Sequence, residues 1–162
     1  MTKQLRILPI AIAIMLVLGA CSSIDCPLNS TVRATYSFKG ETDTLKDTLT
    51  VMAVRANSED SVILNRGINL TSMALPMSYT QNEDVLALVF THEDGTQETD
   101  TIWISKDNMP HFESVDCSPQ YFHTLTGIRC THTRIDDIVI NNPSVDYDET
   151  KENIFIYFRS DD

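Results

Sequence analysis

Basic residues are scarce in this chain of 162 residues, in which 12 Lys and Arg stand against 23 Asp and Glu and the formal net charge is -11. A protein this acidic repels the phosphate backbone of nucleic acids and the headgroups of anionic lipids. The composition therefore excludes nucleic-acid binding and excludes membrane attachment through a basic patch.

The common catalytic and metal-binding motifs are also missing. There is no G-x-S-x-G nucleophile elbow, no CxxC or HxxxH pair with zinc spacing, and no D-x-[DN]-x-[DN]-G calcium loop. Three histidines and two cysteines lie within residues 111–132, but their spacing favours structural roles over a zinc site. We therefore expect no catalytic residue, no metal and no cofactor, and a protein that is not an enzyme.

The first twenty residues have the layout of an export signal. Lys3 and Arg6 form a positive start, residues 7–18 are apolar, and Gly19 and Ala20 are small. The apolar run is too short for a permanent membrane span. Leu-Gly-Ala-Cys at residues 18–21 resembles the lipobox of bacterial lipoproteins, which predicts a signal peptide at 1–20 and lipidation of Cys21.

The residues after Cys21 bear on where such a lipoprotein would be sorted. By resemblance to enterobacterial sorting, Asp directly after the lipidated Cys would favour retention in the inner membrane. Residue 22 is Ser, so we expect the protein in the outer membrane. Residues 22–25 lack the acidic stretch that directs some lipoproteins to the cell surface, which favours the periplasmic face. Residues 21–30, with Pro27 and Asn29, have the turn character of a tether.

Three cysteines remain once Cys21 is committed to lipid. An exported protein lies in an oxidising compartment, so one internal disulfide is expected. The pair Cys26 and Cys117 is preferred, because it would fasten the tether to the late strands and leave Cys130 as a buried thiol. The alternative pair, Cys117 and Cys130, stays open.

Alternating apolar and polar residues dominate the rest of the chain. Residues 32–39 are the clearest example, and similar short runs recur every 8 to 12 residues with turn signals between them. No segment after residue 20 has a helical period. We predict one all-β domain over residues 31–160, an antiparallel β-sandwich of about nine or ten strands. Residues 85–90 should form a central strand covered on both faces, and residues 106–108 a turn.

Two kinds of candidate site remain on the surface. Asp146, Asp148 and Glu149 cluster in a loop and could supply oxygen ligands to calcium, although a solvated acidic turn is favoured. The pattern Asp, hydroxyl residue, aliphatic residue resembles an O-glycosylation motif of exported bacterial proteins. It also suits a chain that leaves a turn and enters a strand. Its hydroxyl residues are Thr44, Thr48, Ser61 and Thr101.

Several segments resemble a family of small lipoproteins from gut-type Bacteroidetes that is known only as a domain of unknown function. They are DTLTV at 47–51, LNRGINL at 64–70, LPMSYTQ at 75–81, ESVDCSPQYFHT at 113–124 and IDDIVINNPSVDYD at 135–148. The resemblance implies an exported β domain and carries over no catalytic residue.

The function that these features favour is a lipid-anchored envelope protein, a non-enzymatic module that binds or assembles with an unidentified envelope protein or glycan. The alternative is a glycan-binding accessory protein or an enzyme with an acidic cleft. Trp103, Tyr79 and Tyr121 are the aromatic residues whose exposure would favour glycan binding, while burial in the core is the more common role of such residues.

Overall fold

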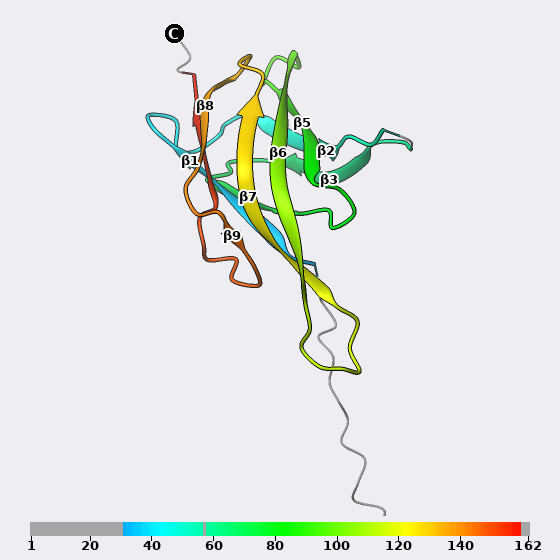
Figure 1. The fold of residues 1–162 in the computed structure, drawn as a ribbon. Helices are drawn as coiled ribbons and strands as arrows, with labels where there is room; N and C mark the ends of the chain where they lie inside the picture. The colour runs from blue at the N-terminus through cyan, green and yellow to red at the C-terminus, as the bar shows by residue number, and fades with distance from the viewer. Residues whose placement is uncertain (1–30, 57, 160–162) are drawn as a thin grey trace, which may run out of the picture.

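The computed structural model describes residues 31–56 and 58–159, which form ten strands and, within those ranges, no helix (Figure 1). The predicted signal segment and tether, residues 1–30, lie outside the described residues. The strands are β1 Arg33–Lys39, β2 Thr48–Ala53, β3 Ser61–Gly67, β4 Ser72–Pro76, β5 Glu83–Thr91, β6 Gln97–His111, β7 Gln120–Cys130, β8 Ile135–Ile140, β9 Ser144–Val145 and β10 Ile154–Phe158.

The strands form two sheets, which confirms the predicted all-β sandwich. One sheet has the order β4-β1-β10-β8 and the other β3-β2-β5-β6-β7-β9. Every pair is antiparallel except β1 and β10, which run parallel, so the expectation of antiparallel sheets fails at that pair. The first and last described strands thus lie side by side in the middle of the smaller sheet, and a parallel pair requires the long connection that separates them.

The hydrophobic core lies between the two sheets and follows the period-two pattern of the sequence. Buried side chains of β1 and β10 meet those of β2, β5 and β6 in one cluster. Phe158 of the smaller sheet contacts Phe90 of the larger sheet edge to face, with ring centroids 5.8 Å apart. The two inner faces therefore interdigitate as in other sandwiches.

Strand β5 is interior to the larger sheet, as its apolar run predicted, but only one of its faces is fully buried. Leu86, Leu88 and Phe90 belong to the core, whereas Val85 and Val89 are half-buried on the outer face. The expected cover on both faces is therefore wrong. No helix in the described part of the chain packs on this sheet, and none there is long and apolar enough to cross a membrane.

The predicted turn at residues 106–108 is also wrong, because β6 continues through it to His111. Strands β6 and β7 pair from Ile102 opposite Cys130 to His111 opposite Gln120, with a register shift after Ser105. The far half of this ladder projects beyond the sandwich as a hairpin (Figure 1). Polar residues such as Lys106 and Asn108 are typical of a turn. Here they belong to a strand, because a loop about 25 residues earlier in the sequence supplies their hydrogen-bond partners.

Candidate functional site

The loop between β4 and β5, residues 77–82, meets the base of the β6–β7 hairpin, and a buried ion pair joins them. The side chain of Lys106 is fully buried, with Nζ 2.9 Å from Asp84 Oδ1 and 2.9 Å from the carbonyl oxygen of Gln81. The other carboxylate oxygen of Asp84 accepts the backbone N–H of Ser78 at 3.2 Å. Each charge is thus both paired and hydrogen-bonded, as a buried ion pair requires.

A second polar pair, Asn108 and His123, continues this network along the hairpin. The side-chain amide of Asn108 donates to the carbonyl oxygen of Gln81 at 2.9 Å, so its Oδ1 is left as an acceptor. His123 Nδ1 lies 2.7 Å from that oxygen and must therefore carry the proton. Burial, and then the charge of Lys106, lower the pKa of His123 to about 4, so the ring is neutral at physiological pH.

Two tyrosines cover this network. Tyr79 of the loop stacks on Tyr121 of β7, with ring centroids 4.9 Å apart and planes 13° from parallel. Tyr79 is 60% exposed, so the stack lies at the surface. Sequence analysis singled out both residues as aromatics to examine, and the exposure of Tyr79 departs from the burial that is usual for them. The sequence did not reveal that the loop between β4 and β5 contacts β7.

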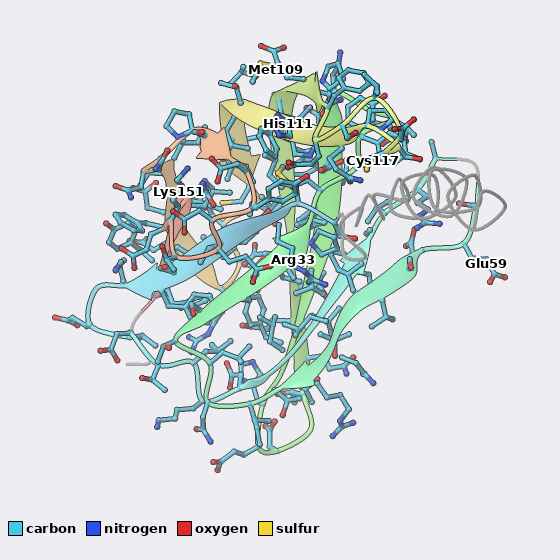
Figure 2. All side chains as sticks on the ribbon, turned by 90° about the horizontal axis from the view of Figure 1, so that it is seen from below. Arg33, Glu59, Met109, His111, Cys117 and Lys151 are labelled. Carbon is cyan, nitrogen blue, oxygen red and sulfur yellow. The ribbon has the colours of Figure 1, made fainter. Side chains whose placement is uncertain are left out.

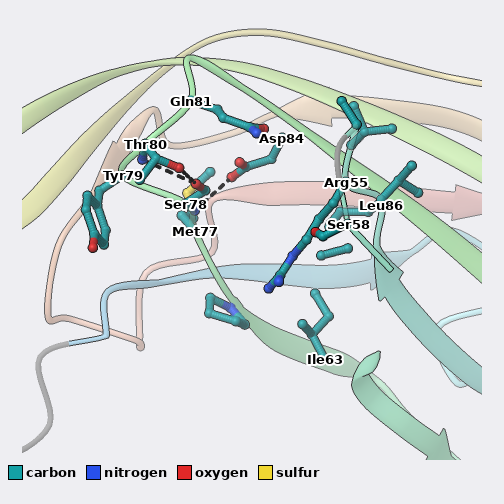
Figure 3. Close-up of a pocket in the computed structure, with 15 residues that line it drawn as sticks. Arg55, Ser58, Ile63, Met77, Ser78, Tyr79, Thr80, Gln81, Asp84 and Leu86 are labelled. Atoms are coloured by element: carbon teal, nitrogen blue, oxygen red, sulfur yellow. Dashed lines mark hydrogen bonds between the residues drawn. The ribbon is translucent and has the colours of Figure 1, made fainter. Parts of the chain in front are cut away.

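One pocket opens beside the loop, between the sheets at the edge formed by β3 and β4 (Figure 3). Its volume is about 470 Å³, within the range of small-ligand sites. Ala53, Ile63 and Leu86 give it an apolar wall, and Ser78 and Thr80 add hydroxyl groups. Its one carboxylate, Asp84, is engaged by Lys106, so this pocket lacks the converging acids that an acidic catalytic cleft needs.

A second pocket, which we call the tyrosine pocket, lies on the other side of the loop and has a volume of about 460 Å³. Residues 118–121, Thr31, Val32, Met77, Tyr79 and His123 line it. His123 is the single titratable side chain of this lining apart from the tyrosine hydroxyls, and it is neutral. The pocket therefore presents aromatic and uncharged polar groups.

A third hollow, which is shallow and more acidic than these two, lies between β1 and the loop before β10. Asp43, Glu149 and Glu152 line it together with Lys39. The Lys39 ammonium lies 2.7 Å from Glu152 and lowers the pKa of that carboxyl group. A general acid at neutral pH needs a raised pKa, so the arrangement does not suit acid catalysis.

The tip of the hairpin carries a group of exposed apolar side chains, which we call the hairpin tip: Met109, Phe112 and Val115. They are 50%, 63% and 98% exposed. Figure 2 views the molecule from this end and shows Met109, His111 and Cys117 there. On one face of the hairpin His111 stacks on Phe122 at 4.2 Å, and Tyr147 contacts Phe122 edge to face at 5.0 Å. Sequence alternation alone gave no signal of this exposure.

The predicted cysteine roles are partly resolved. Cys117, in the loop of the hairpin, is disulfide-bonded, and Cys130 carries a free thiol. The alternative pair of Cys117 with Cys130 is therefore wrong. Cys130 is half-buried on β7 rather than buried, and burial, together with Asp100 and Asp137, raises its pKa to about 11. Cys21 and Cys26 lie outside the described residues, so lipidation and the pairing of Cys26 stay predictions.

The candidate calcium ligands do not converge. Asp146 pairs with Lys151, Asp148 accepts hydrogen bonds from Thr150, and Glu149 lies 3.7 Å from Arg33. Across the described residues, no three His, Cys, Asp or Glu side chains are grouped to hold a metal ion. The loop carboxylates are used for local turns and ion pairs.

The four hydroxyl candidates for O-glycosylation follow aspartates that have structural partners. Asp60 Oδ1 accepts the N–H of Arg55 at 3.1 Å and closes the β2–β3 turn before Ser61. Asp100 is buried and accepts four hydrogen bonds from residues 131–135 next to Thr101. Thr44 Oγ1 donates to Asp43, and Asp47, before Thr48, binds His92. Glycosylation at Thr44, Thr48, Ser61 or Thr101 stays a prediction.

Residues 48–158, from β2 to the end of β10, match a family of unknown function, DUF6452. Neither a curated protein nor a solved structure matches the chain. The match covers more than half of the sequence and includes the loop, the hairpin and the lining of both pockets beside them, except Thr31 and Val32 of the tyrosine pocket. The chain belongs to the DUF6452 family.

Proposed function

We propose that this member of the DUF6452 family is a lipid-anchored envelope protein, a non-enzymatic module that binds a protein partner through the tip of its β6–β7 hairpin. The single observation that carries the proposal is the exposure of Met109 near the end of β6 and of Phe112 and Val115 in the loop that follows, on a hairpin that extends beyond the sandwich. Apolar side chains gathered on a projecting element are typical of an interaction surface.

The energetics support a partner at this position. Covering an exposed side chain of this size contributes about 1.5–3 kcal/mol. The hairpin tip would therefore supply much of the free energy of a specific contact, as interface anchors do. The chain's acidic character favours a partner with a basic rim around an apolar centre.

The proposed disulfide would bring the lipid anchor to the same end of the molecule. Cys117 belongs to the loop that joins β6 to β7, and we propose that Cys26 is its disulfide partner. Only the four residues 22–25 would then separate the lipidated Cys21 from the disulfide to the hairpin. Such a link would hold the hairpin tip close to the periplasmic face of the outer membrane, where a membrane-bound partner is within reach.

The experiment places a photo-reactive amino acid at Phe112 in the native envelope and, as a matched control, at Glu93 in the β5–β6 turn. Both sites are exposed hairpin positions, so they differ in location rather than in access to solvent. We expect a reproducible crosslinked protein from position 112 that disappears when Val115→Asp is added. Equal crosslinking from both positions, or no loss with Val115→Asp, would show that the hairpin tip is not the contact.

The anchor is tested separately. Cys21→Ser should move the protein from the membrane fraction to the soluble fraction, and continued membrane retention would refute lipid attachment. Peptide mapping without reduction should join the peptide of Cys26 to that of Cys117. A Cys26 thiol that reacts freely in exported protein would refute the pairing.

A further inference from the structure

The lining of the tyrosine pocket includes a buried histidine that uses only one of its two ring nitrogens. His123 is 2% exposed, and its Nδ1–H is donated to Asn108 Oδ1. Its Nε2 has no hydrogen-bond partner in the described part of the chain and is not sealed from solvent. His123 is one of the residues that line the pocket.

The network behind the ring fixes what Nε2 can do. The carbonyl oxygen of Gln81 sets the orientation of the Asn108 amide, and the amide in turn sets the tautomer of His123. Nε2 therefore presents a lone pair. The buried ammonium of Lys106 opposes protonation of the ring, so this acceptor stays uncharged above about pH 4. A ligand that uses it must donate an O–H or N–H.

The walls of the pocket restrict the ligand further. Tyr79 and Tyr121 supply flat apolar surface, while Gln120 and Ser118 supply an amide and a hydroxyl group. No ionised side chain lines the pocket, so nothing there compensates a charged ligand. A pyranose ring has the matching character, with an apolar C–H face and a rim of hydroxyl groups.

We propose that the tyrosine pocket binds a neutral saccharide, with its C–H face on the Tyr79 ring and one hydroxyl donated to His123 Nε2. This site goes beyond the proposed function, because it lies between the hairpin and the β4–β5 loop and uses none of the hairpin-tip side chains. The orientation of the sugar follows from the single buried acceptor, since a site built to bind a hydroxyl discriminates against a sugar that lacks it.

The test follows the His123 Nε2 resonance in the full chain labelled with ¹⁵N-histidine, during separate titrations with cellobiose, maltose and chitobiose. A zwitterionic detergent is used, because a maltoside detergent would itself carry a sugar. We expect at least one disaccharide to shift this resonance to lower frequency with saturation, as a lone pair that accepts a hydrogen bond does. Tyr79→Leu should weaken that affinity about fivefold to tenfold.

Tyr147→Leu is the matched control, because Tyr147 is an exposed tyrosine of the other aromatic group. It should leave the titration unchanged. Absence of a saturable shift with all three disaccharides would overturn the proposal, as would equal affinity in the Tyr79→Leu protein. Equal binding of a disaccharide that contains glucuronate would also overturn it, since the site has no cation for a carboxylate. Loss of crosslinking at the hairpin tip would leave this titration unaffected.

Discussion

The buried histidine of the hairpin should make folding stability sensitive to acid. His123 has a pKa of about 4 in the folded protein, against 6.5 for the free side chain. The unfolded chain therefore binds more protons between these values, so stability must rise with pH across that window and fall as the solution is acidified. The loss begins below about pH 6.5 and is complete below about pH 4.

The magnitude follows from the difference of about 2.5 between these pKa values. At about 1.4 kcal/mol for each unit, the full effect is about 3.5 kcal/mol, and about 2 kcal/mol of it falls between pH 7 and pH 5. Other groups also titrate in this range, so the quantity to compare is the slope of stability against pH in the wild type and in His123→Gln.

Urea denaturation at a series of pH values measures that slope. The wild type should lose about 2 kcal/mol more than His123→Gln between pH 7 and pH 5. His123→Gln can still accept or donate a hydrogen bond to Asn108, so it removes the titration with little change of shape. Parallel curves for the two proteins would refute the assigned burial and tautomer of His123.

Three other changes test the charged and thiol groups. In urea denaturation, Lys106→Met should lower the free energy of unfolding by about 3–5 kcal/mol, because it leaves the buried Asp84 carboxylate without its cation. Adding Asp84→Leu should restore most of this stability, and an equal loss in the single and the double variant would contradict the reasoning. The hydrogen bond with Asp47 raises the pKa of His92 in the folded protein. The resulting contribution to folding stability is present below about pH 6.5 and is lost as the pH rises through the folded pKa. His92→Gln should therefore destabilise the protein more at pH 5 than at pH 8. The raised pKa of Cys130 should slow its alkylation by iodoacetamide at pH 8 about 100-fold relative to the unfolded chain, and similar rates would contradict that burial.

The strand pattern could be predicted from the sequence because each strand carries its own evidence. Alternation in β1 and β10 and the apolar run in β5 correspond to the buried faces of those strands, and turn residues separate them. The same local reasoning failed for β6. Lys106 and Asn108 look like turn residues unless the loop that satisfies them is known.

The candidate site was predictable in part. Tyr79 and Tyr121 were recognised as aromatics worth examining, but their stacking joins a loop and a strand 42 positions apart. The exposure of the hairpin tip could not be predicted, because alternation in a strand does not show whether another sheet packs against its apolar face. The free thiol of Cys130 distinguishes between pairings that the count of cysteines left open.

The sequence by itself determined the all-β class, the acidity of the chain and the positions of most strands, because these depend on composition and on neighbours two residues apart. Tertiary structure alone decided that Lys106 is buried, that His123 is neutral and that His123 lines a pocket. The physical reason is that a buried polar group depends on partners supplied by distant segments, and only the folded chain brings them within hydrogen-bond distance.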